Sequence, residues 1–162
     1  MVRVNCFLIR PMCPEDLEAL VALWRRSRED GQPWLEARMG RSPSDDRHYF
    51  ENVIAQQFAV WVACEGQRPL GLLAWRPDEV DQLFVDPPAQ GRGVGTALLE
   101  KAMALSPAGF TLFTAQRNQR ARDFYERRGM RPVAFGISPP PEEEPDVKYA
   151  WTPAGLGTER SE

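Results

Sequence analysis

Apolar residues in the first third of the chain recur at intervals of three and four positions, which is the spacing of one face of an α-helix. Pro14 suits the first turn of such a helix, because the N–H that proline lacks would have no partner there. We therefore predict a helix over residues 14–28, preceded by a strand over residues 3–10, where apolar and polar residues loosely alternate. The apolar face of this helix consists of Leu17, Leu20, Val21 and Trp24.

A second helical repeat follows a stretch that we expect to be broken at Gly31, Pro33, Gly40 and Pro43. Ser44 can cap this helix, because a serine side chain accepts a hydrogen bond from a free N–H of the first turn. Its apolar face would consist of Tyr49, Phe50, Val53 and Ile54.

From residue 58 onwards the apolar residues form the short runs that are typical of strands. Three such runs lie close together, and the short turns between them favour antiparallel neighbours. The second half of the chain adds a helix after Gly95, a strand, a second helix that stops at Gly129, and two final strands. The predicted strands are 58–65, 70–75, 79–85, 110–115, 131–136 and 146–151.

This order of elements predicts an α/β (α+β) fold, with a central mixed, mostly antiparallel sheet flanked by about four helices. The chain has 162 residues, 43% of them hydrophobic, which suits a single domain over residues 1–152. Residues 153–162 are expected to form a flexible tail. The segment SPPPEEEP at 138–145 contains no core-forming residue and is expected to be an exposed loop.

The composition excludes several classes of function. The net charge is −3 and no basic tract is interleaved with aromatic residues, so we expect no nucleic-acid partner. No apolar run approaches the ~20 residues of a membrane span, so we expect no membrane partner. The three cysteines form no paired motif and the single histidine cannot build a metal site alone, so we expect no metal and a cytoplasmic location.

The segment QGRGVG, from Gln90 to Gly95, joins an apolar strand to a helix. Glycines at the start of a helix leave free N–H groups that can surround a phosphate. The segment lacks the lysine of a P-loop, and its GxGxG spacing differs from that of a dinucleotide fold. A glycine-rich turn without a ligand remains the alternative on this segment alone.

Two segments together resemble the Gcn5-related N-acetyltransferase (GNAT) superfamily. LFVDPPAQGRGVGTALLEKA is similar to motif A of that family, with Gln90, Gly93 and Gly95 at the signature positions. NQRARDFYERRGM is similar to its motif B, in which an asparagine opens a helix that contains a tyrosine and closes at a glycine. The order of elements agrees with this family over residues 3–151.

The resemblance implies an acyltransferase that uses acetyl-CoA as the acyl donor. It places the pyrophosphate on the glycine segment and the pantetheine arm along the strand before it, with the acyl group entering a gap between that strand and the strand at 110–115. The implied donor-binding residues are Leu83, Phe84, Val85, Gln90, Gly91, Arg92, Gly93, Val94, Gly95, Thr96, Asn118 and Tyr125.

Transfer of an acetyl group to an amine at neutral pH benefits from a base, because alkyl amines have a pKa near ~10.4. Glu79 and Asp81 are candidates, since residues two apart on a strand point to one face. The alternative for each is a solvated charge at the start of a strand. An acidic residue on this strand, often acting through water, is a frequent base in the family.

The other steps of the reaction also have candidates. A backbone N–H near Phe84 or Val85 could stabilise the oxyanion. The resemblance implies that Tyr125 donates a proton to the leaving thiolate, although a tyrosine beside Phe124 could equally be a core residue. Asn118 can cap its helix whether or not it reaches the donor.

We therefore expect direct acetyl transfer from acetyl-CoA to an amine on a small molecule or a peptide. The acidic residues 142–144 could attract a cationic amine or serve only to solubilise a loop. A non-catalytic acyl-CoA sensor or interaction module on the same fold is the alternative. A homodimer, formed through the last strands and Trp151, is a further expectation that the resemblance raises.

Overall fold

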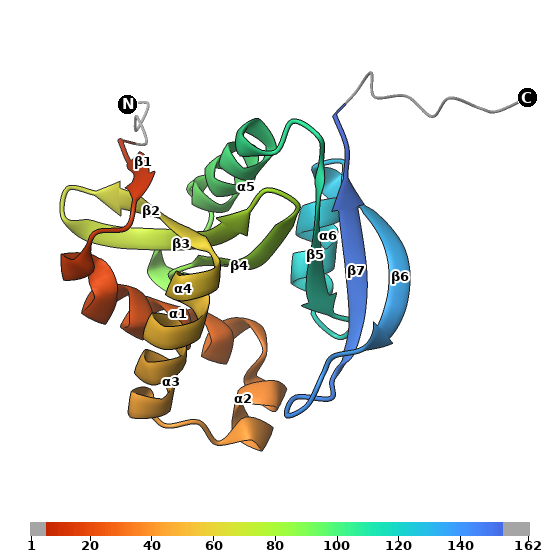
Figure 1. Ribbon diagram of the computed structural model, residues 1–162, viewed down its shortest axis with the longest axis horizontal. Coiled ribbons are helices and arrows are strands. Elements are labelled where there is room, and N and C mark those ends of the chain that lie inside the picture. The colour runs from red at the N-terminus through yellow and green to blue at the C-terminus, as the bar shows by residue number, and fades with distance from the viewer. Residues whose placement is uncertain (1–5, 154–162) are drawn as a thin grey trace, which may run out of the picture.

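The computed structural model describes residues 6–153 of the chain, and its central feature is a seven-stranded sheet (Figure 1). The strands are β1 (Leu8–Pro11), β2 (Ala59–Glu65), β3 (Arg68–Arg76), β4 (Glu79–Val85), β5 (Phe110–Ala115), β6 (Arg131–Ile137) and β7 (Pro145–Trp151). Their order across the sheet is β1-β2-β3-β4-β5-β7-β6. Only β4 and β5 pair in parallel, so the predicted mixed, mostly antiparallel sheet is confirmed.

The helices cover both faces of the sheet. They are α1 (Leu17–Gly31), α2 (Pro33–Met39), α3 (Pro43–Tyr49), α4 (Ala55–Gln57), α5 (Val94–Leu105) and α6 (Gln119–Arg127), with a π-helical segment at Phe50–Ile54. On one face, Leu20 and Leu23 of α1 pack with Leu72 of β3. On the other, Leu98 of α5 shares a second core with Tyr149 of β7.

The segment between the first two predicted helices was expected to be broken, but it contains α2. Pro33 is its first residue, and Gly40 ends it in the left-handed conformation with φ 60°. Proline at the start and glycine just past the end are common helix boundaries. The residues expected to break the chain therefore delimit a short helix.

Three other boundaries differ from the prediction. Ser42, not Ser44, caps α3, because its side chain accepts a hydrogen bond from the Asp45 N–H at 3.1 Å. The first strand begins at Leu8, and residues 3–5 of the predicted strand lie outside the described residues. The predicted tail also lies outside them, apart from Pro153.

Strands β4 and β5 pair at one position only, Glu79 opposite Thr111, and then diverge (Figure 1). Beyond that position β4 has a hydrogen-bonded neighbour only on its β3 side. The predicted gap between these two strands is therefore present. It divides the sheet into an arm formed by β1 to β4 and an arm formed by β5, β7 and β6.

A β-bulge interrupts β4 at Asp81. Ala74 of β3 lies opposite Gln82, and the next residue, Trp75, lies opposite Val80, so Asp81 is the extra residue. A bulge breaks the alternation of side chains between the two faces of a strand. The regular strand predicted over residues 79–85 is therefore interrupted at Asp81.

Candidate active site

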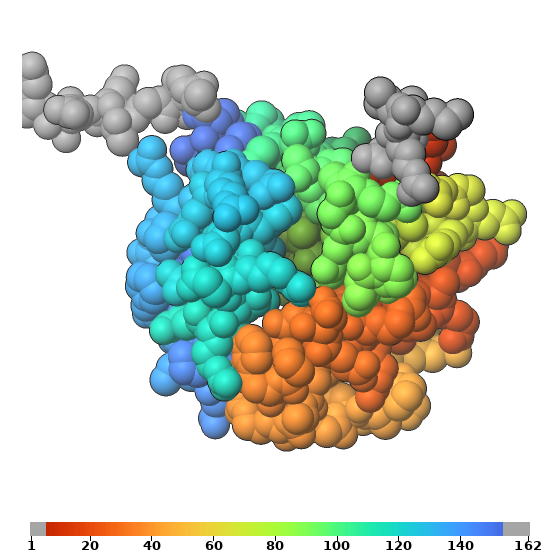
Figure 2. All heavy atoms as spheres, turned by 180° about the vertical axis from the view of Figure 1, so that it is seen from behind, coloured from red at the N-terminus to blue at the C-terminus, as the bar shows by residue number. Residues whose placement is uncertain are grey.

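A cleft of about 1530 Å³ lies between the two arms of the sheet. It is lined by β4 and α1 on one side and by β5, α6 and the loop between β6 and β7 on the other. Seen from behind, it opens as a recess between α5 and α6 (Figure 2). A cleft of this size exceeds the ~300–1,000 Å³ of most single-ligand pockets and can hold parts of two substrates.

The N-terminal end of α5 forms the rear wall of the cleft. Gly91 and Gly93 adopt φ values of 79° and 82°, in the left-handed region that favours glycine. The N–H groups of Gly93, Val94 and Gly95 have no acceptor among the described residues. Free N–H groups at the positive end of a helix dipole make this end of α5 suitable for a phosphate group.

Helix α6 packs closely against this wall. A Cβ atom on Gly95 would lie 3.3 Å from the ring of Phe124, so glycine permits the close approach. Asn118 caps α6, since its side chain accepts a hydrogen bond from the Ala121 N–H at 3.1 Å. Thr96 at the other helix accepts a hydrogen bond from Arg128 at 2.9 Å.

Tyr125 lies on the cleft side of α6 and is largely buried. Burial raises the pKa of its hydroxyl well above the usual range, and the charge of Tyr149 adds to this effect. The hydroxyl makes no hydrogen bond with any other described residue. Tyr125 is therefore a protonated donor that faces the cleft.

The backbone of β4 presents two N–H groups to the gap. The Asp86 N–H donates to the Leu70 carbonyl at 2.8 Å, in the register that pairs Val85 with Gly71. Hydrogen-bonded and non-hydrogen-bonded pairs alternate along antiparallel strands. The N–H groups of Leu83 and Val85 therefore point towards the gap, while that of Phe84 points towards β3.

The two candidate bases lie in different surroundings. Glu79 sits where β4 and β5 still pair, and it forms an ion pair with Arg76. Asp81 lies further along the diverging strand and forms no ion pair with a described residue. Desolvation raises the pKa of Asp81, and the nearby charge of Glu79 raises it further, although the carboxylate remains accessible through the cleft mouth.

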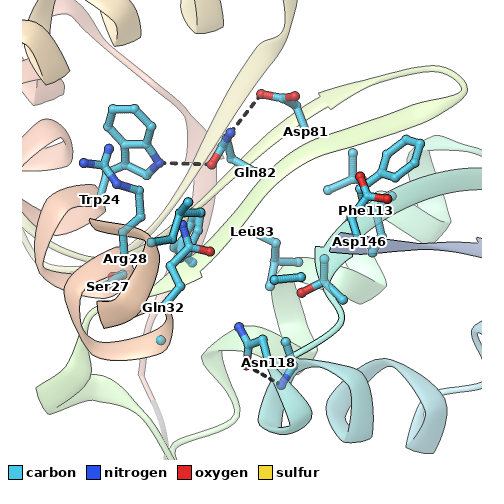
Figure 3. Close-up of a pocket in the computed structure, with 18 of the residues that line it drawn as sticks. Trp24, Ser27, Arg28, Gln32, Asp81, Gln82, Leu83, Phe113, Asn118 and Asp146 are labelled. Carbon is cyan, nitrogen blue, oxygen red and sulfur yellow. Dashed lines mark hydrogen bonds between the residues drawn. The ribbon is translucent and has the colours of Figure 1, made fainter. Parts of the chain in front are cut away.

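Two hydrogen bonds connect Asp81 to the core of α1 (Figure 3). The Gln82 Nε2 donates to Asp81 Oδ2 at 3.0 Å, and the Trp24 Nε1 donates to Gln82 Oε1 at 3.0 Å. Adjacent side chains of a regular strand point to opposite faces. The bulge at Asp81 breaks this alternation, in keeping with the contact between Asp81 and Gln82.

The front part of the cleft is acidic and aromatic. Tyr49 of α3 lies near Asp81 and Glu142, whose charges add to the desolvation that raises its pKa. Across the cleft lie Asp146 of β7 and Phe113 of β5 (Figure 3), and Phe113 is 52% exposed. These groups suit a ligand that carries positive charge on an aliphatic chain.

The loop between β6 and β7 meets α2 at the open end of the gap. Glu144 accepts hydrogen bonds from Trp34 at 2.9 Å and from Arg38 at 2.7 Å, and its own side chain is buried. Arg41 forms an ion pair with Glu142 at 2.8 Å. The expectation of an exposed loop is therefore wrong at Glu144, which α2 covers. We call these contacts the clasp.

A smaller bridge crosses the rear of the cleft. Asp30, near the end of α1, accepts hydrogen bonds from Arg120 at 2.7 Å and from Gln90 at 3.2 Å. Gln90 thus lies next to the end of α1. Arg92 does not line the cleft and forms an ion pair with Glu65 of β2, so its contact with a phosphate stays a prediction.

Residues 17–130 match the sequence profile of the acetyltransferase (GNAT) family. The chain belongs to this family. It is 31% identical over 127 residues to the peptidyl-lysine N-acetyltransferase YjaB of Salmonella typhimurium, covering 76% of this chain and 82% of that protein. The match between chain and family makes the protein an acyltransferase.

Solved structures of the family share the fold. The apo form of YjaB from Escherichia coli has a TM-score of 0.71 and 27% identity, over 90% of this chain and 97% of that one. The PaiA N-acetyltransferase from Thermoplasma acidophilum in complex with coenzyme A has a TM-score of 0.62 and 17% identity, over 88% of this chain and 98% of that one. The predicted GNAT fold is confirmed.

Two further observations concern the part of the chain that the structure describes. It has no helix long and apolar enough to cross a membrane. It also has no group of three or more histidine, cysteine, aspartate or glutamate side chains that could hold a metal ion.

The structure brings all the other predicted site residues to the one cleft. Sequence reasoning missed the residues that approach from distant elements, namely Gln82, Tyr49, Phe113 and Asp146. Tyr49 was assigned to the apolar face of its helix, yet it is 49% exposed at the cleft. A polar residue next to a candidate base was the only local signal for Gln82.

The clasp leads to a prediction for Glu144→Gln. Glutamine keeps one oxygen to accept a hydrogen bond and replaces the other by an NH2 group, so one of the two bonds from α2 is lost. Losing a hydrogen bond to a buried charged group costs about 1–3 kcal/mol. We expect amide hydrogens of residues 33–39 and 138–145 to exchange about ten- to a hundredfold faster, as measured by mass spectrometry.

Glu143→Gln is the matched control, because the Glu143 side chain is exposed and makes no hydrogen bond or ion pair with a described residue. Equal exchange in the two variants would contradict the role of Glu144 in the clasp.

Proposed function

We propose that the protein transfers an acetyl group from acetyl-CoA directly to a primary amine, and that the amine is the side chain of a lysine in a peptide or protein. The single pairing between β4 and β5 is the observation that carries this proposal. It leaves a strand edge inside the cleft, next to the free N–H groups of α5. An extended thioester with a pyrophosphate at its far end matches these two features.

The residues of the rear wall fit coenzyme A. A side chain at Gly91 or Gly93 would project into open space, so the loop is bare where a pyrophosphate would lie. Leu83 and Val85 offer N–H groups to the amides of a pantetheine arm or to the carbonyl oxygen of the acetyl group. When bound, acetyl-CoA supplies the thioester: the amine nitrogen bonds to the carbonyl carbon, the carbon–sulfur bond breaks, and sulfur leaves with its electron pair.

Asp81 is our candidate for the base. It lies on the diverging part of β4, near Leu83, and forms no ion pair with a described residue. Its raised pKa brings it closer to neutrality, where a general base is most effective. Glu79 is less suitable because it is ion-paired with Arg76 at the closed end of the gap.

Tyr125 is our candidate for the group that stabilises the leaving sulfur. A thiolate with a pKa near ~8.5 is a weaker base than the tyrosinate of Tyr125, so full proton transfer from the tyrosine is unfavourable. A hydrogen bond from the protonated hydroxyl to the thiolate is favourable. We propose this hydrogen bond in place of a complete proton transfer.

The acceptor is proposed from two observations. The front of the cleft has carboxylates at Asp81 and Asp146, which attract an ammonium group, beside the rings of Tyr49 and Phe113. Relatives in Salmonella typhimurium and Escherichia coli are named peptidyl-lysine N-acetyltransferases. We also propose that the protein acts in the cytoplasm, where acetyl-CoA and protein lysines are both present.

Asp81→Asn tests the base, with Glu79→Gln as the matched control. Release of free thiol from acetyl-CoA is measured with a lysine-containing peptide over a range of pH. We expect kcat/KM of Asp81→Asn to fall by about 10²–10⁴, because the base is removed. The decrease of kcat/KM towards low pH, which we call the acidic limb, should also disappear. The wild-type limb should lie above the ordinary aspartate pKa, since desolvation raises it.

A loss of activity confined to Glu79→Gln would reassign the base. Binding of coenzyme A without thiol release, for every amine offered to the wild type, would point instead to an acyl-CoA sensor.

Gly93→Val tests the proposed phosphate site at the N-terminal end of α5, with Gly66→Val as the matched control. Both glycines have positive φ and open space around them, but Gly66 lies in the turn between β2 and β3. Valine strains the backbone at either position by about 1–2 kcal/mol. We expect the affinity for coenzyme A, measured by calorimetry, to fall at least tenfold in Gly93→Val only. Equal affinities of the two variants would contradict the proposed phosphate site.

A further inference from the structure

We infer that Gln82 and Trp24 are positioning residues for Asp81: the indole of Trp24 fixes the amide of Gln82, and that amide holds the carboxylate so that one oxygen stays free for the amine of the acceptor. This inference rests on the proposed function in one respect, the assignment of Asp81 as the base.

The orientation of the Gln82 amide follows from the chemistry of its partners. The indole N–H of Trp24 can only donate, so the atom that faces it must be the oxygen of Gln82. The amide nitrogen is then directed at Asp81, where it donates at 3.0 Å. A glutamine without the indole could turn its amide over and place its oxygen against the carboxylate.

Trp24 is itself held by its neighbours. It is 3% exposed, and the guanidinium of Arg28 lies 3.8 Å from its ring centroid. Arg28 is fixed in turn by Asp46 of α3 at 2.8 Å and by Glu36 of α2 at 3.0 Å. A continuous set of contacts therefore runs from the helical layer to the carboxylate in the cleft.

The hydrogen bond from Gln82 occupies only one carboxylate oxygen. Asp81 Oδ2 accepts it, and Oδ1 accepts no hydrogen bond from a described residue. In the proposed step an N–H bond of the ammonium group breaks, its electron pair stays on nitrogen, and the proton bonds to Oδ1. The Gln82 amide stabilises the charged form of Asp81 before this step and so limits the pKa of the base.

Other groups act on Asp81 at the same time. Glu79 of β4 and Glu142 of the β6–β7 loop raise its pKa, Arg76 of β3 lowers it, and Tyr49 of α3 lies nearby. Desolvation has the largest effect on the pKa of Asp81, and the hydrogen bond from Gln82 has the second largest. Substituting Gln82 should therefore shift the pKa of Asp81 in a defined direction.

The test compares Gln82→Met, Gln82→Glu and Trp24→Phe with the wild type. Methionine has about the volume of glutamine and no N–H, so the pKa of Asp81 should rise and the acidic limb of kcat/KM should move up by about one pH unit. Glutamate adds a second negative charge and should move the limb further in the same direction. Trp24→Phe should move it in this direction too, and the double variant with Gln82→Met should match Gln82→Met alone.

Gln67→Met is the matched control, because Gln67 lies in the exposed turn between β2 and β3 and should leave the limb unchanged. A direct titration of the Asp81 carboxyl carbon by NMR measures the same pKa without turnover. It also applies if Trp24→Phe does not fold.

The outcomes separate this inference from the proposed function. If Asp81→Asn removes the acidic limb while Gln82→Met and Gln82→Glu leave both the limb and the NMR pKa at their wild-type values, Asp81 is the base and the inference is wrong. If the limb persists in Asp81→Asn, the base assignment is wrong, and the catalytic role of Gln82 is wrong with it. Movement of the limb in the order wild type, Gln82→Met, Gln82→Glu supports both.

Discussion

The backbone pairing of Glu79 with Thr111 is the point at which the two arms of the sheet are joined through β4 and β5. One hydrophobic core spans both arms on the α5 face of the sheet, and a second core on the other face joins α1 to the arm formed by β1 to β4. Beyond this pairing the strands separate, and the cleft occupies the space that further pairing would have filled. On this edge of β4 the N–H groups of Leu83 and Val85 have no acceptor among the described residues, and an extended ligand can supply one.

The helices on either side determine what the gap can do. Behind it, the N-terminal end of α5 and the nearby α6 provide free N–H groups and a protonated tyrosine. In front of it, α1 and α3 carry the groups that surround Asp81. The clasp between α2 and the β6–β7 loop joins the two arms again at the open end. The cleft therefore has free N–H groups at one end and acidic and aromatic side chains at the other, which suits a reaction between two substrates.

The local features of this arrangement could be predicted from the sequence. The glycines before α5, Asn118 at the start of α6 and Tyr125 within it belong to short continuous segments, and the structure places them together. The features that sequence reasoning missed depend on contacts between distant segments. The bulge at Asp81 exists only in relation to the register of β3, and the burial of Glu144 depends on α2, more than a hundred positions earlier in the chain. Helix α2 itself is only 7 residues long, too short for a clear repeat, and its boundary residues resemble those of a loop.

The central claim is that the free edge of β4 receives the acyl donor, and amide hydrogen exchange followed by NMR tests it most directly. The N–H groups of Leu83 and Val85 point into the gap, while the register directs those of Gln82 and Phe84 towards β3, so these two serve as internal controls. Saturating coenzyme A should slow exchange at Leu83 and Val85 by at least tenfold and change the two controls much less. Unchanged exchange at Leu83 and Val85, with coenzyme A bound, would contradict the claim.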